Sequence, residues 1–210
     1  MRVAVYVDGF NLYYRALRKT PYKWLDLHKL SASLIDPTDT IVKIKYFTAR
    51  VSGRDDPDEP KRQHIYLRAL ETLPNFEIIY GNFLPKIIKR PLVNPPDPQN
   101  RYVQIHTTEE KGSDVNLASH LLHDGWRDFY DIALIMSQDT DFVLPFSFVK
   151  NDLKKTIILV WLDGKQATIK LKEVVDHVRH ITPNRLAQAQ FPMVITDNKG
   201  RVLQKPSTWL

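Results

Sequence analysis

Two aspartates stand one residue apart directly after an apolar run, in the segment IALIMSQDTDF between Ile132 and Phe142. The apolar residues end at Met136, and Asp139 and Asp141 follow. Such a run is typical of a buried strand in the middle of a sheet. Charge at the exit of a buried strand is unfavourable unless something pairs with it. We expect that partner to be a divalent metal ion.

Two other acids occupy comparable places. Asp8 follows the first apolar stretch, residues 3–7, and Asp114 opens a helical stretch after Lys111-Gly112-Ser113. In an open α/β sheet, ligands bind outside the carboxyl ends of the strands. If the first strand and the fourth, residues 132–136, are neighbours, all the acids converge on one rim. A turn or helix-capping role is the alternative for each acid alone, but three such places on one side of a sheet favour a shared site.

A cluster of carboxylates without His or Cys predicts a particular kind of ion. Left bare, the carboxylates would repel one another, and some would take up protons. Hard oxygen ligands suit magnesium or manganese. Such an ion, kept partly hydrated, activates a water and holds a phosphoryl oxygen. The chemistry indicated is the in-line hydrolysis of a phosphodiester, with no protein nucleophile.

The elements that must position these acids alternate along most of the chain. We expect strands at residues 3–7, 41–51, 76–84, 132–136 and 156–162, and helices at 11–19, 25–35, 60–73, 114–123 and 169–175. A further helix follows residue 141, and we expect Asp141 or Thr140 to cap it. Alternating strands and helices predict an α/β domain whose central, mostly parallel sheet carries helices on both faces.

Two segments depart from this alternation. Residues 85–110 combine basic residues with the proline-rich NPPDPQN and an alternating stretch at 102–107, which predicts a basic flap or hairpin. The chain from residue 181 holds prolines, a short strand-like FPMVITD and a terminal tryptophan. We therefore predict a main domain at residues 1–180, with the flap at about 85–110, and a C-terminal appendage at 181–210 that docks on it.

Basic and aromatic residues near the flap could bind a nucleic acid. A basic groove tracks the phosphate backbone, and an aromatic ring stacks on a base. The candidates are Lys111, Lys86, Lys89, Arg90, Arg101 and Tyr102. The alternative is that these side chains are simply solvated. Near the first acid, we expect Tyr13 and Tyr14 to supply one core ring and one groove ring.

Composition limits the class of protein. The chain has 210 residues, no cysteine and a net charge of +6 from 30 basic and 24 acidic residues. The lack of cysteine excludes disulfides, cysteine-ligated zinc, iron–sulfur clusters and a thiol nucleophile. A mildly basic chain is compatible with a nucleic-acid partner and equally with plain solubility. No apolar run could cross a bilayer and the start is no secretory signal, so we expect no membrane association and a cytoplasmic location.

Three stretches in this order, VAVYVDGFNLYY, KGSDVNLASHLL and IALIMSQDTDFVLPF, resemble the NYN domain family, a branch of the PIN-like nuclease superfamily. The resemblance covers roughly residues 1–165. The closing stretch, LAQAQFPMVITDNKGRVLQKPSTW, is similar to the tail of bacterial LabA-like members. The resemblance implies a PIN-like Rossmannoid fold and metal-dependent ribonuclease activity.

The resemblance also assigns roles to particular residues. It implies that Asp8, Asp114, Asp139 and Asp141 are catalytic and bind the metal. Asn11 and Ser137 would support them by hydrogen bonding to a carboxylate or to a metal-bound water. Gln138 departs from the family pattern, which has a small residue there, often Gly. We expect the larger side chain to narrow the rim where substrate would enter.

The expected function is therefore that of an endoribonuclease that uses Mg²⁺ or Mn²⁺ to cut single-stranded or locally unpaired RNA. A phosphatase with an aspartyl nucleophile would need an acid at Phe10. A non-catalytic RNA-binding or regulatory protein that keeps the fold is the alternative, and a toxin or defence role would differ only in context. RNA versus DNA, the preferred sequence, the number of metal ions and the oligomeric state stay open. The flap and the apolar tail would both suit a homodimer contact.

Overall fold

A six-stranded parallel sheet forms the centre of the protein, in the order β3-β2-β1-β6-β7-β8. The computed structural model describes residues 1–54, 56–96 and 100–209. The strands are β1 (Arg2–Asp8), β2 (Thr40–Thr48), β3 (Phe76–Tyr80), β6 (Ile132–Met136), β7 (Thr156–Trp161) and β8 (His177–His180). The two central strands, β1 and β6, are almost entirely buried, as expected of apolar strands covered on both sides.

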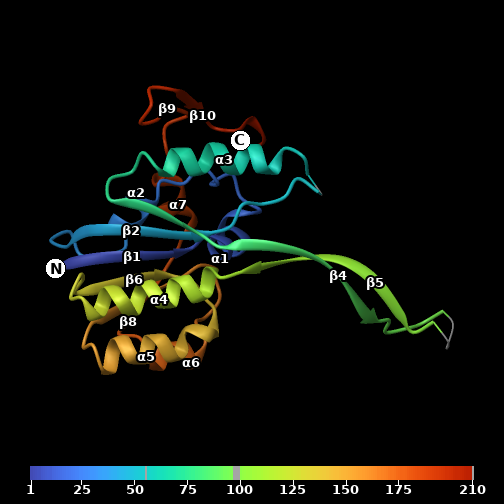
Figure 1. Cartoon of the computed structure of the whole chain (residues 1–210). Helices are drawn as coiled ribbons and strands as arrows, with labels where there is room; N and C mark the ends of the chain where they lie inside the picture. Colours follow the sequence, from blue (N-terminus) through green and yellow to red (C-terminus); the bar gives the residue numbers. More distant parts are fainter. Residues whose placement is uncertain (55, 97–99, 210) are drawn as a thin grey trace.

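Helices cover both faces of this sheet (Figure 1). One face carries α1 (Gly9–Leu12), its continuation η1 (Tyr13–Leu17), α2 (Leu27–Ala32), α3 (Glu59–Leu70) and α7 (Pro183–Gln188). The other carries α4 (Ser113–Trp126), α5 (Val143–Asn151) and α6 (Ile169–Glu173), with the short η2 (Thr140–Phe142) before α5. Alternate residues of β1 enter the two cores: Val5 packs in the first and Tyr6 in the second. The predicted α/β class with helices on both faces is confirmed.

The predicted strand at residues 76–84 is wrong, because the chain forms two strands there. β3 ends at Tyr80, and β4 (Asn82–Pro91) then pairs with β5 (Tyr102–Lys111) in a separate antiparallel ribbon. The apolar pattern runs on through Gly81 and so hides the break. Pro85 does not stop the strand, since in a two-stranded ribbon each strand is an edge strand and tolerates a missing N–H donor.

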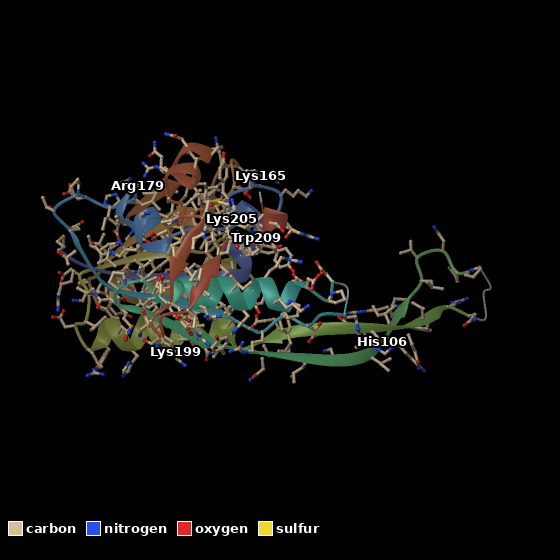
Figure 2. The ribbon with its side chains drawn as sticks, turned by 90° about the horizontal axis from the view of Figure 1, so that it is seen from above. His106, Lys165, Arg179, Lys199, Lys205 and Trp209 are labelled. Carbon is tan, nitrogen blue, oxygen red and sulfur yellow. The ribbon has the colours of Figure 1, made fainter. Side chains whose placement is uncertain are left out.

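The β4–β5 hairpin leaves the body at the carboxyl ends of the central strands and projects into solvent (Figures 1 and 2). His106, which pairs with Ile87, marks the middle of the paired strands in Figure 2. Large apolar side chains along it are exposed, among them Leu84, Ile87 and Tyr102. An isolated two-stranded hairpin is only marginally stable in water. The stability of this ribbon therefore depends on the groups that contact it.

The segment after β8 packs on the face that carries α3. It contains α7, the hairpin of β9 (Val194–Thr196) and β10 (Val202–Gln204), and η3 (Ser207–Trp209). Trp24 Nε1 donates to the Pro192 carbonyl at 2.7 Å, and Arg68 on α3 pairs with Asp197 at 2.5 Å. β8 and α7 were not predicted, because their short sequences carry few apolar residues. None of the helices in the described ranges is long and apolar enough to cross a membrane.

Candidate active site

Strand pairing brings the first and fourth predicted strands together. β1 and β6 are parallel neighbours, with Val7 opposite Met136. Asp8 and Ser137, the next residue on each strand, therefore meet at the carboxyl edge of the sheet. Ser137 Oγ donates to Asp8 Oδ2 at 3.0 Å, across 129 positions of sequence. The adjacency on which the sequence argument depended is confirmed.

Asp8 is buried and held on both oxygens. Only 5% of the residue is exposed, and its Oδ1 accepts the Asn11 backbone N–H at 2.9 Å, which caps α1. Burial raises the pKa of Asp8, while the hydrogen bonds from Asn11 and Ser137 act in the opposite direction. The carboxylate is therefore fixed in orientation but destabilised as an anion.

Asp139 begins the turn that follows β6. Its Oδ1 accepts the Asp141 N–H at 3.0 Å, and its own N–H donates to Ser137 Oγ at 3.2 Å. The expectation that Asp141 or Thr140 caps the helix is wrong. The turn η2 begins one residue earlier, so Thr140 and Asp141 lie inside it and Asp139, with extended backbone, is the cap.

Asp114 lies in the first turn of α4 and shares the field of the other acids. Gly112 precedes this helix with a φ of 97°, a conformation that favours glycine. The pKa of Asp114 is raised to about 6, first by partial removal from water and then by the charges of Asp8, Asp139, Glu110 and Asp141. The structure thus brings all four predicted acids into one electrostatic cluster.

Glu110 is a further carboxylate that the sequence argument missed. Its Oε1 accepts the Ser113 N–H at 3.1 Å, at the start of α4. The sequence pattern places residue 110 at the end of the flap, and only the return of β5 to the sheet brings it to the acids. The signal available in the sequence was its position four residues before Asp114.

Among the residues that the structure describes, no cationic side chain pairs with this cluster. In the part of the chain that the structure describes, no Lys, Arg or His forms an ion pair with Asp8, Asp114, Asp139 or Asp141. Ser113 Oγ, beside Asp114 in the chain, is buried without a hydrogen-bond partner. Uncompensated carboxylates and an unused hydroxyl are groups that a hydrated divalent cation would satisfy.

The donor set fits such a cation in chemistry and charge, but the ligands are not preassembled. Among the described residues, no three His, Cys, Asp or Glu side chains stand close enough to form a ready-made metal site. Metal binding would therefore require the side chains to move. Asp141 is exposed and free to do so, whereas Asp8 is buried and fixed by its hydrogen bonds.

Gln138 does not narrow the rim, contrary to the sequence expectation. Its side chain is buried, with 5% of the residue exposed, and its Oε1 accepts the Leu162 N–H at 3.3 Å. The Gln138 N–H in turn donates to Asn11 Oδ1 at 3.3 Å. Gln138 thus joins the ends of β6 and β7 and orients Asn11, whose own N–H bonds Asp8.

The basic candidates are spread along the hairpin. Lys86 and Lys111 both pair with Glu109, at 2.5 and 3.1 Å, so Lys111 contacts an acid of the hairpin. Side chains alternate between the two faces of a strand. Lys86 and Arg90 therefore share one face, and the register places Lys89 with Tyr102 on the other.

The basic and aromatic candidates of the hairpin are exposed to solvent. Lys89, Arg90, Arg101 and Tyr102 are all exposed, Tyr102 to 63%. The base of the hairpin, where Asn82 pairs with Lys111, adjoins the start of α4 and hence Asp114. A polymer lying along the hairpin would therefore lead to the acids.

Comparison with known proteins bears on this geometry. The family model described as NYN domain matches residues 2–182. The chain is 32% identical over 238 aligned residues to 6-hydroxy-3-succinoylpyridine 3-monooxygenase HspA of Pseudomonas putida, an alignment that covers 100% of this chain and 75% of that protein. A crystal structure of a protein of unknown function from Vibrio parahaemolyticus superposes with a TM-score of 0.54 at 19% identity, over 87% of this chain and 94% of that one. The last likeness shows the fold alone.

Proposed function

We propose that this chain, which belongs to the NYN domain family, hydrolyses RNA phosphodiester bonds as a metal-dependent endoribonuclease. Family membership supports a nuclease-like fold and, at the coarse level, a nuclease-type enzyme. The observation that carries the finer proposal is the carboxylate cluster, which has no cationic partner among the described residues. Partial burial, and then the charges of the neighbouring acids, raise the pKa of Asp114 to about 6. The relation to the LabA-like branch stays a prediction.

Asp8, Asp114, Asp139 and Asp141 would hold Mg²⁺ or Mn²⁺. When bound, the ion would activate a water for attack on phosphorus and stabilise the charge that develops on the phosphoryl oxygens. The residues of the chain have separate tasks. Ser137 fixes Asp8 Oδ2 by donating to it, and it accepts the Asp139 N–H, so one hydroxyl sets the relative position of two ligands.

Asn11 and Gln138 form a second support for Asp8. Asn11 bonds Asp8 through its backbone N–H and accepts from the Gln138 N–H through its side chain. Gln138 in turn is tied to β7 through the Leu162 N–H. Gln138 is buried at the end of β6 and Asn11 is half-buried on α1, whereas Asp141 lies on an exposed turn that could adjust to an incoming ion.

RNA would reach the acids along the hairpin. Lys86, Lys89, Arg90 and Arg101 offer positive charge for the backbone, and Tyr102 offers an exposed ring on which a base could stack. Lys111, at the base of the hairpin, stands three residues before Asp114 and could meet a phosphate. Single-stranded or locally unpaired RNA suits this arrangement, since an unpaired base is free to stack. A homodimer through the hairpin and a cytoplasmic location stay predictions.

The proposal is tested by incubating labelled single-stranded RNA with the protein in Mn²⁺, in Mg²⁺ and in chelator. Asp139→Asn removes one ligand charge, and Asp152→Asn is the matched control because Asp152 is exposed and lies at the end of α5, away from the acids. We expect metal-dependent cleavage that is lost in the first variant and kept in the second. If the wild type binds RNA but never cuts it, the nuclease proposal is wrong and the alternative, a non-catalytic RNA-binding protein, takes its place.

A second candidate function follows from the relative in Pseudomonas putida, whose name describes a monooxygenase acting on a substituted pyridine. The 32% identity across this whole chain supports monooxygenase activity as the second candidate. A monooxygenase needs dioxygen and an electron donor, whereas hydrolysis needs neither. Oxygen uptake that depends on both a pyridine substrate and NADH or reduced flavin would favour this candidate over the nuclease.

A further inference from the structure

A cavity of about 300 Å³ opens behind the acid cluster, between α1–η1, the start of α3 and the C-terminal η3. It adjoins the cluster through Gly9, which lines the cavity and directly follows Asp8. The wall is close at this point, since a Cβ on Gly9 would lie 2.6 Å from the Tyr46 ring and 2.8 Å from the Phe47 carbonyl oxygen. The position therefore requires glycine.

Aromatic rings from five elements form the walls. Phe10 and Tyr13 come from α1 and η1, Tyr46 from β2, Tyr66 from α3 and Trp209 from η3. Tyr66 and Trp209 meet edge to face, with ring centroids 5.9 Å apart. Flat, apolar walls of this kind suit a planar ring, because aromatic contacts combine a large buried area with defined geometry.

The helix that supplies Tyr13 is itself unusual. Residues Tyr13–Leu17 form a π-helix, in which the Arg18 N–H donates to the Tyr13 carbonyl at 2.7 Å. π-Helical turns are rare and frequently occur at functional sites. Here the wider turn places Tyr13, Tyr14 and Leu17 on the cavity together.

Lys23 on the cavity wall, with the charge of Lys205 close to it, makes one end of the cavity positive. Lys23 lines the cavity, and its Nζ donates to the Thr20 carbonyl at 2.8 Å. Lys205 Nζ donates to the Pro21 carbonyl at 3.3 Å, one residue along the same turn. Neither ammonium has a carboxylate within ion-pair distance in the described ranges. Burial lowers the pKa of Lys23, and the charges of Lys205 and Arg62 lower it further.

The acids of the cavity wall do not neutralise this end. Asp56 forms its ion pair with Arg62. Glu59 also lines the cavity, and its charge raises the pKa of Tyr13 after the larger effect of burial. Glu59 thus lies near Tyr13, and among the described residues neither acid forms an ion pair with Lys23.

We propose that this cavity binds a small planar aromatic molecule that carries a carboxylate, with the ring between Tyr13, Tyr66 and Trp209 and the carboxylate on Lys23. The volume is at the low end of ligand pockets, which suits one ring with a short acidic chain rather than a length of polymer. Trp209 closes the wall, so the C-terminal segment completes the site. This inference does not depend on a metal or on RNA cleavage.

The test uses 4-oxo-4-phenylbutyrate as the probe and isothermal titration calorimetry on the full chain in chelator. The neutral amide of the same compound is the matched ligand without the charge. Adenosine monophosphate tests whether a nucleotide, which also combines an aromatic ring with an anionic group, is the preferred ligand. Lys23→Met removes the charge and keeps the apolar stem, Lys23→Arg restores the charge, and Lys199→Met is the control on the exposed β9–β10 turn, distant from Trp209 in Figure 2. Thr208→Trp fills the cavity from its wall.

We expect the acid to bind about tenfold more tightly than the amide, and Lys23→Met to weaken it about tenfold, as for the loss of one charge-assisted hydrogen bond. Lys23→Arg should retain most of the affinity, Thr208→Trp should abolish binding and Lys199→Met should change nothing. The proposal is overturned if the probe does not bind at millimolar concentration, if Lys23→Met and Thr208→Trp bind like the wild type, or if the nucleotide binds more tightly than the acid.

Discussion

The two ends of the strands β1 and β6 carry aspartates in opposite electrostatic situations. At the amino end, Asp131 accepts the Arg2 backbone N–H at 2.7 Å and pairs with the Arg2 guanidinium at 2.6 Å. Hydrogen bonds from the Arg2 side chain lower the pKa of Asp131 to about 2. Asp128 beside it pairs with Arg2 and Lys155.

At the carboxyl end, Asp8, Asp114, Asp139 and Asp141 have no such partner in the described ranges, and the pKa of Asp114 rises to about 6.

The difference teaches which acids the fold uses for its own stability. A paired carboxylate stabilises the folded chain, whereas a cluster of unpaired ones costs stability and persists where function needs it. The same sheet therefore supplies an internal control for every experiment on the acids. Variants at the amino end should lower stability and leave activity unchanged, whereas variants at the carboxyl end should lower activity.

The largest effect we predict is on cleavage. Asp139→Asn should lower metal-dependent RNA cleavage by more than about 100-fold, since the loss of groups that merely support a metal ligand already costs 10–100-fold. Asp131→Asn should leave the rate constant within about twofold. Single-turnover rates at saturating protein measure both. Equal losses in the two variants would remove the distinction between the ends.

The next effect is on stability in the presence of metal. Saturation with Mn²⁺ at about 100 times its Kd should stabilise the wild type by about 2.7 kcal/mol, which corresponds to a rise in Tm of about 5–10 °C for a chain of this size. Asp139→Asn should lose this rise, and Asp131→Asn should keep it from a lower starting Tm. Thermal melts with and without chelator provide the measurement. An identical rise in all three proteins would place the ion elsewhere.

A smaller effect concerns the paired end. Asp131→Asn should destabilise the protein by about 1 kcal/mol, because the charge-assisted bonds to Arg2 are strong but partly exposed to solvent. The pKa of Asp131 is lower in the folded state, so its contribution is fully present above about pH 4 and is lost as the pH falls through about 2. Urea melts at pH 7 and pH 3 check this, and the difference between variant and wild type should shrink at the lower pH.

The smallest effect has the opposite sign. Asp114→Asn should stabilise the metal-free protein by about 1 kcal/mol at pH 7, a value discounted for its exposure to solvent. The folded-state pKa of about 6 lies above the ordinary value of 3.8, so the wild type loses stability as the pH rises from about 4 to 6. The variant lacks this loss, and the two proteins should be equally stable below about pH 4. Urea melts in chelator across this pH range measure the difference. If Asp114→Asn were less stable than the wild type at pH 7, the prediction that the Asp114 carboxylate destabilises the metal-free protein would be wrong.

The sequence alone predicted the local elements well where the pattern was strong. The apolar run at residues 132–136 became β6 with those bounds, and the acids after it were identified as candidates. It could not show the break at Gly81, since an apolar pattern continues across a chain that leaves one sheet for another. The prediction that the Gln138 side chain narrows the rim was also wrong, because the sequence does not show whether an amide side chain is buried or exposed.

What the sequence determined by itself is the inventory of groups and their order: aspartates at strand ends, no cysteine, and a basic segment between the third strand and Asp114. Only the tertiary structure decided that Glu110 joins the acids, that Asp139 begins its turn, and that Trp209 closes a cavity with Tyr13 and Tyr66. The physical reason is distance along the chain. Propensity and periodicity act over a few residues, whereas charge repulsion and cavity walls arise between groups that parallel strand pairing and helix packing bring together.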